Sequence, residues 1–71
     1  MDLLNMYPER EEYVELLNGR ATQVWVPDGV KIQRGDNARA SFGTLSVPVV
    51  IEEFEPSDSV GWLKVMVRPV S

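Results

Sequence analysis

The sequence predicts an α+β fold that is mostly β, in which one short N-terminal helix precedes a five-stranded antiparallel small barrel or curled sheet. Apolar residues recur with helical spacing only near the start of the chain, over residues 8–18. From residue 21 onward they alternate with polar residues, as they do in half-buried strands. Short links rich in glycine, proline and aspartate separate the alternating segments, which is typical of small barrels. We therefore interpret residues 1–71 as a single domain, with the helix at 8–18 and the barrel at 21–70.

The predicted helix has a start signal, an apolar stripe and a stop signal. Pro8 favours the first helical position, where its missing N–H group would have no partner in any case. Tyr13, Leu16 and Leu17 follow at helical spacing and form one apolar stripe. Gly19 can adopt the left-handed conformation that ends a helix. A helix of about eleven residues is not stable alone in water, so the stripe must dock on the rest of the protein.

Five alternating segments are predicted to form the strands. They cover residues 21–26, 30–33, 38–42, 45–54 and 61–70. Short sequential strands with turn-rich links favour a small SH3-like barrel or a curled sheet, which also protects the backbone groups of edge strands. Pro48 cannot donate a ladder hydrogen bond, so we expect an edge strand or a bulge there. The side chains predicted to face the interior are Val24, Val26, Val30, Ile32, Phe42, Leu45, Val47, Val49, Ile51, Leu63, Val65 and Val67.

The tripeptide Arg34-Gly35-Asp36 raises three alternatives, which are an adhesion ligand, a phosphate cradle and a turn. A turn explains every residue, because glycine supplies a positive φ angle and aspartate binds the local backbone. An adhesion ligand belongs on a secreted protein, and the sequence shows no secretion signal and no disulfide. A phosphate cradle needs more backbone amides than one glycine without a following helix provides. Asp28-Gly29 predicts a second turn, with Gly29 at a positive φ angle.

The composition removes several kinds of chemistry. The 71 residues include no cysteine and no histidine, which leaves no disulfide, thiol nucleophile, imidazole base or usual zinc ligand. Acid–base chemistry would rest on carboxylates alone, so we expect no enzymatic activity, no cofactor and no bound metal. No apolar run approaches the roughly 20 residues that a membrane helix needs, so we expect no membrane partner.

The charge balance argues against nucleic acid as the partner. Seven basic and eleven acidic side chains give a net charge of −4. Affinity for nucleic acids depends on neutralising phosphates, so we expect this chain to bind them poorly. A single-strand platform is the alternative, because stacking aromatics next to basic residues form such platforms. Its members would be Trp25 with Arg20, Lys31, Arg34 and Arg39.

An acidic stretch surrounds Phe54. We interpret it as solvated surface, with a weak cation site or a docking surface for a basic partner as the alternatives. Neighbouring strand residues point to opposite faces, so two adjacent carboxylates of this stretch should not converge. The stretch consists of Glu52, Glu53, Glu55 and Asp58.

The main candidate site lies on the face opposite the aliphatic interior. Trp25, Trp62 and Met66 point to that face, and Trp62 and Met66 share one side of a strand. Two alternatives stay open. Either the N-terminal helix covers these side chains, or they form a protein–protein interface, where tryptophan and methionine are enriched. Lys64 and Arg68 would then supply a polar rim. The candidate partner-binding residues are Trp25, Trp62, Met66, Arg68, Glu52, Glu53 and Glu55.

Residues 21–68 resemble the barrel segment of small head–tail joining (neck or connector) proteins of tailed phages. In that family a hydrophobic strand runs into a Gly-Asp turn, and a short strand, a strand end bearing proline and aspartate, and a last alternating strand follow. The segment NGRATQVWVPDG also resembles the family's first strand. The other matching segments are Arg34-Gly35-Asp36, Val49-Val50-Ile51, Glu55-Pro56 with Asp58, and Gly61 to Val67.

This resemblance implies a non-enzymatic protein–protein interaction module that acts as a structural joining protein. Its partner would be a virion component or a host protein, with homo-oligomerisation left open. The expected location is the host cytoplasm or the virion, without secretion by a signal of its own. An alternative is a small acidic phage-encoded inhibitor that docks on a host nucleic-acid-binding or defence protein. Its phosphate-like side chains would be Glu9, Glu11, Glu12, Glu15, Glu52, Glu53, Glu55 and Asp58.

A further resemblance is to PUA-like and ASCH-type RNA-binding barrels. Those barrels run from a helix through a Gly-x-Lys-Thr segment and a strand to a Gly-Asp turn. Here Gly19-Arg20-Ala21-Thr22 occupies the place where a lysine is expected. This resemblance implies an RNA-binding barrel and is the third alternative for function.

Overall fold

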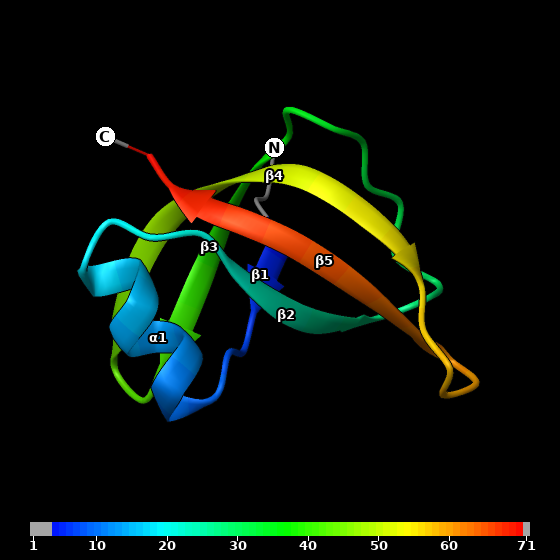
Figure 1. Ribbon diagram of the computed structural model, residues 1–71, viewed down its shortest axis with the longest axis horizontal. Helices are drawn as coiled ribbons and strands as arrows, with labels where there is room; N and C mark the ends of the chain where they lie inside the picture. Colours follow the sequence, from blue (N-terminus) through cyan, green and yellow to red (C-terminus); the bar gives the residue numbers. More distant parts are fainter. Residues whose placement is uncertain (1–3, 71) are drawn as a thin grey trace.

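The computed structural model describes residues 4–70, whose strands form one curled sheet in the order β1-β3-β4-β5-β2 (Figure 1). The sheet curls into a half-barrel, and the single helix lies at one end of it. The predicted fold class, α+β and mostly β with one short helix, is therefore confirmed. The elements are β1 (Leu4–Met6), α1 (Arg10–Leu17), β2 (Thr22–Pro27), β3 (Asn37–Phe42), β4 (Leu45–Pro56) and β5 (Trp62–Pro69).

The strand set differs from the prediction at two places. The structure adds β1, which pairs with β3 in parallel, so the sheet is antiparallel only at its other three pairings. Three residues are too few to show a period of two, although Met6 is completely buried beside its partner Ala40. Residues 30–33, predicted as a strand, belong instead to the irregular link between β2 and β3. Val30 and Ile32 are half-buried there, so their alternation reflects packing without ladder pairing.

The helix begins at Arg10, so the predicted start at Pro8 is wrong by two residues. Glu9 is the N-cap residue, and its backbone N–H donates to the Glu12 carboxylate at 2.8 Å. This bond satisfies one of the donors that a helix start leaves free. Pro8 is buried just before the cap, where it directs the chain from β1 into the helix.

The end of the helix and its buried face agree more closely with the prediction from the sequence. Gly19 has φ of 78° and donates its N–H to the Leu16 carbonyl at 3.1 Å, as expected for a glycine that ends a helix. Tyr13 and Leu16 are buried. Leu17 is exposed, so the apolar stripe is narrower than predicted.

The interior lies between the concave side of the sheet and α1. Six of the predicted interior residues are buried, and Val30, Ile32, Val47 and Leu63 are half-buried. Phe42 and Leu45 are exposed, because the hairpin that joins β3 and β4 extends past the packed region. Phe42 still stacks on Tyr13, with ring centroids 5.4 Å apart. The buried hydrophobic residues are Met6, Tyr13, Leu16, Val24, Val26, Ala38, Ala40, Val49, Ile51, Val65 and Val67.

A bulge in β4 reverses the expected facing of its acidic segment. Ile51 pairs with Val67 and points inward, and a period of two would send Glu53 inward as well. The register shifts between Ile51 and Glu53, so that Glu53 pairs with Met66 on the outer face. Glu52 is the extra residue. Glu52 and Glu53 are consequently both exposed, and the prediction that they point to opposite faces is wrong.

Pro48 lies in a central strand, not in an edge strand or at the bulge. Its missing N–H group is accommodated because the ladder between β4 and β5 ends at the neighbouring pair, Val49 and Pro69. The Pro48 carbonyl accepts the Val70 N–H at 3.0 Å, so the side of Pro48 that lacks a donor faces the end of β5.

The predicted Arg-Gly-Asp turn is confirmed. The Asp36 N–H donates to the Gln33 carbonyl at 3.1 Å, and the Gln33 N–H donates to the Asp36 carboxylate at 2.9 Å. Gly35 has φ of 86° and donates to the Ile51 carbonyl at 2.8 Å, which fixes the turn against β4 beside the bulge. The other predicted turn also forms, but its Gly29 does not have a positive φ angle, so that detail is wrong.

Candidate functional site

Trp25 and Trp62 are diagonal neighbours on the convex face of the sheet. Val24 and Val26 are buried, so the period of the strand directs Trp25 outward from β2. Trp25 pairs with Lys64 of β5, and Trp62 is two residues before Lys64 on the same side of that strand. Diagonal residues of an antiparallel pair are about 7–8 Å apart, which large aromatic side chains can span. We call Trp25 and Trp62 the indole pair.

The helix does not cover the indole pair. Trp25 is 40% exposed, Trp62 is 45% exposed and Met66 is 36% exposed. Leu16 of α1 packs with the buried valines on the opposite, concave side of the sheet. Of the two alternatives from the sequence, cover by the helix is therefore wrong. The indoles are available to another molecule.

A cleft of about 750 Å³ opens beside the indole pair. It lies between β1 and β2, the two edge strands of the half-barrel, where some Cα atoms of the two strands come within 8 Å of each other. We call it the seam cleft. Its lining is Leu4, Asn5, Met6, Tyr7, Glu9, Glu12, Trp25, Val26, Pro27, Val30 and Trp62.

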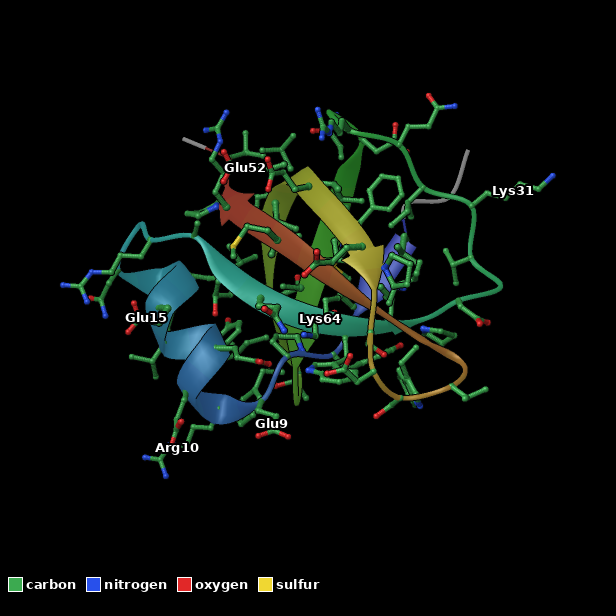
Figure 2. All side chains as sticks on the ribbon, turned by 45° about the vertical axis from the view of Figure 1, so that its right-hand side comes forward. Glu9, Arg10, Glu15, Lys31, Glu52 and Lys64 are labelled. Carbon is green, nitrogen blue, oxygen red and sulfur yellow. The ribbon has the colours of Figure 1, made fainter. Side chains whose placement is uncertain are left out.

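The seam cleft combines apolar and aromatic walls with negative charge. Its charged lining residues are Glu9 and Glu12, and the Glu12 carboxylate also accepts the Glu9 N–H of the helix cap. None of the described lining residues is basic. Figure 2 shows Arg10 and Lys31 pointing away from the body of the protein, although each is next in sequence to a lining residue. The cleft therefore favours a ligand with apolar groups and positive charge.

Met66 lines a second, smaller hollow of about 260 Å³. This hollow lies on the outer face of β4 and β5, where Glu53 pairs with Met66 and Glu55 pairs with Lys64. Acidic and basic side chains alternate around it, so it lacks the single sign of charge of the seam cleft. Its lining is Gln23, Arg34, Glu53, Phe54, Glu55, Lys64 and Met66.

Arg68 and Glu52 form an ion pair at the far end of β5. The Arg68 Nε atom lies 3.2 Å from a Glu52 carboxylate oxygen, and both side chains are substantially exposed. Such a pair contributes about 0–1 kcal/mol to stability. The sequence-predicted candidates are thus divided among three places: the indole pair at the seam cleft, Met66 with Glu53 and Glu55, and the Glu52–Arg68 pair.

The basic residues do not form one strip beside Trp25. Arg20 pairs with Glu15 at 3.4 Å near the end of the helix, and Arg34 lines the smaller hollow. Lys31 points away from the protein in Figure 2. Arg39 pairs with Pro48 in the ladder between β3 and β4. Within residues 4–70, no three acidic side chains gather as a metal site would require.

Sequence reasoning missed part of the cleft lining. Tyr7 is highly exposed and lines the cleft, and no binding role was predicted for it. Glu9 and Glu12 were candidates only as scattered acidic side chains, because nothing in the sequence places the start of the helix beside Trp25. The sequence carries no usable signal for β1, which also lines the cleft, because three residues are too few to show a period of two.

Comparison of the chain with protein-family models, with curated proteins and with solved structures found no match. None of the described residues belongs to a helix that is long and apolar enough to cross a membrane.

Proposed function

We propose that this protein is a non-enzymatic protein–protein interaction module that binds its partner through the indole pair and the seam cleft. The observation that carries this proposal is the exposure of Trp25 and Trp62, which are diagonal neighbours on the outer face and both line the seam cleft. Tryptophan is enriched among the residues that dominate binding energy at protein interfaces. Each further 100 Å² of apolar surface that a partner covers contributes about 2.5 kcal/mol before the costs of association.

A more specific version of the proposal is a structural head–tail joining protein, and it rests on the sequence resemblance. The two edge strands β1 and β2 and the exposed indole pair supply surface for self-association or for binding to a ring. Light scattering at increasing protein concentration tests this version, which predicts growth in mass or binding to a virion component. A particle that stays monomeric and binds no virion component contradicts it.

The other two versions have less support from the arrangement of charges. An acidic inhibitor would present its carboxylates as one surface, but these are divided between α1 and β4, and Glu15 and Glu52 each pair with an arginine. An RNA-binding barrel would use Arg20 and Arg34, which lie at separate places. Charge reversal of the acidic side chains that leaves inhibition intact contradicts the first version. Absence of an RNA mobility shift at low salt contradicts the second.

The general proposal is tested by comparing what the wild-type protein and a Trp25→Ala/Trp62→Ala variant capture from a host or phage lysate. The matched control is Leu45→Ala, which also removes an exposed apolar side chain but lies on the β3–β4 hairpin, outside the cleft lining. We expect one partner to be retained by wild type and by the control and lost by the double variant. Equal capture by all three proteins contradicts the proposal.

A further inference from the structure

We infer that the seam cleft binds an extended segment of a partner protein in which lysine or arginine stands next to apolar side chains. This inference rests on the proposed function and specifies the kind of partner at the same site. Three features of the cleft lead to it: its walls, its charge and its width.

The walls are suited to apolar side chains. Trp25 and Trp62 line it from β2 and β5, and Leu4 of β1 and the exposed Tyr7, which follows β1, line it as well. Aromatic rings offer large contact areas with few rotatable bonds, so little conformational entropy is lost when a ligand covers them. The volume of about 750 Å³ lies within the range of about 300–1,000 Å³ that is common for ligand sites. It accommodates a few side chains of a segment, not a domain.

The charge of the cleft selects for a cation. Glu9 and Glu12 line it without a basic neighbour among the described lining residues. Lys64, the ladder partner of Trp25, lines the smaller hollow and is not among the lining residues of the seam cleft. A guanidinium or ammonium group in the cleft would meet the two carboxylates and the face of an indole, and both interactions favour it.

The width of the cleft decides how the segment binds. A sixth strand inserted between β1 and β2 would need about 9–10 Å between them, because paired strands lie about 4.8 Å apart. Some Cα atoms of β1 and β2 are within 8 Å, so the half-barrel is too narrow there for a strand that pairs on both sides. The segment is therefore held by its side chains in the cleft and does not complete the sheet.

Short synthetic peptides test this inference. The first peptide combines arginine with leucine and proline, the second replaces arginine with glutamate, and the third replaces the apolar residues with serine. Binding is followed at low salt by the NMR signals of the two indoles. We expect the first peptide to shift both indole signals, the second to leave them unchanged and the third to bind at least about tenfold more weakly.

Variants assign the charge effect to the cleft. Glu9→Gln with Glu12→Gln keeps an acceptor for the helix cap and should weaken binding of the first peptide about three- to tenfold. Glu11→Gln is the matched control, because it removes the same charge from the same turn of the helix outside the cleft lining, and affinity should change much less. Trp25→Ala should weaken binding by about thirtyfold or more.

Several results would overturn the inference. They are equal binding of the glutamate peptide, unchanged affinity of the Glu9→Gln/Glu12→Gln variant, and indole shifts that follow protein concentration alone, which would assign the cleft to a second copy. If no peptide binds, while the double tryptophan variant still loses a partner from lysate, the inference fails and the proposed function stands. If that variant keeps the partner, both fail.

Discussion

Trp25 stands between two buried valines of β2 and is the clearest case in which a single residue could be placed from the sequence. The period of two fixes its face once Val24 and Val26 are assigned to the interior. Trp62 follows by the same rule on β5, since Leu63 and Val65 turn inward. Glu53 shows the limit of that rule, because one extra residue in β4 reverses its facing.

Glycine positions give a residue-scale prediction about the link between β2 and β3. Gly35→Ala should lower the free energy of unfolding by about 1 kcal/mol, because its φ of 86° is strained for alanine. Gly29→Ala is the matched control, since Gly29 does not have a positive φ angle and nothing lies within 4 Å of an added Cβ. It should be neutral or raise stability by up to about 1 kcal/mol. Urea denaturation measures both variants, and equal losses would contradict the assigned turn.

At the scale of elements, strong local signals in the sequence were sufficient to predict five of the six helices and strands. The helix has a period, a cap region and a terminal glycine, and β2, β3, β4 and β5 have alternation between turn residues. β1 could not be predicted, because three residues carry no measurable period and their pairing with β3 spans more than 30 positions in sequence. Residues 30–33 alternate between apolar and polar side chains as a strand would. A turn at each end of this segment separates it from the neighbouring strands, so it forms no ladder hydrogen bonds with them.

The buried face of α1 gives the first prediction at this scale. Leu16→Ala should lower the free energy of unfolding by about 2–5 kcal/mol, because Leu16 is fully enclosed by the core. Leu17→Ala changes the same side chain one position later, where it is exposed, and should cost less than about 0.5 kcal/mol. Thermal or urea unfolding measures the difference. Similar costs for the two leucines would mean that the helix docks by another face.

The bulge in β4 gives a second prediction. Deleting Glu52 removes the extra residue of the bulge and leaves Ile51 facing inward and Glu53 facing outward, so the variant should still fold. Its free energy of unfolding should fall by about 1 kcal/mol, because the ion pair with Arg68 and the local curl of the strand are lost. Deleting Val50 should cost about 3 kcal/mol or more, because it would bring a carboxylate to the buried place of Ile51. Circular dichroism with urea titration compares them. A larger loss of unfolding free energy from the Glu52 deletion than from the Val50 deletion would contradict the assigned register of β4 and β5.

At the scale of the whole molecule, the site exists because the sheet does not close into a complete barrel. A sheet that curls only to a half-barrel leaves β1 and β2 as edges, and the seam cleft forms where these edges approach each other. The sequence predicted the outward indoles but not the cleft, because the cleft joins residues 4–12 to β2 and β5 through tertiary packing. Local periodicity carries no information about such a meeting of distant segments.

A chain of 71 residues without cysteine has no disulfide to supplement this packing, and its stability is expected to be small. Moving two tryptophans into the interior would be the usual way to enlarge a small core. Their position outside it fits the binding role that we propose for the indole pair.

The exposure of the indole pair, on which this role depends, is measured most directly by the relaxation of side-chain protons by a soluble paramagnetic gadolinium chelate, recorded by NMR on the isolated protein. We expect strong relaxation of the ring protons of Trp25 and Trp62, and little relaxation of the methyl groups of Val65 and Val67, which are completely buried. Indole rings that are as well protected as those methyl groups would contradict it.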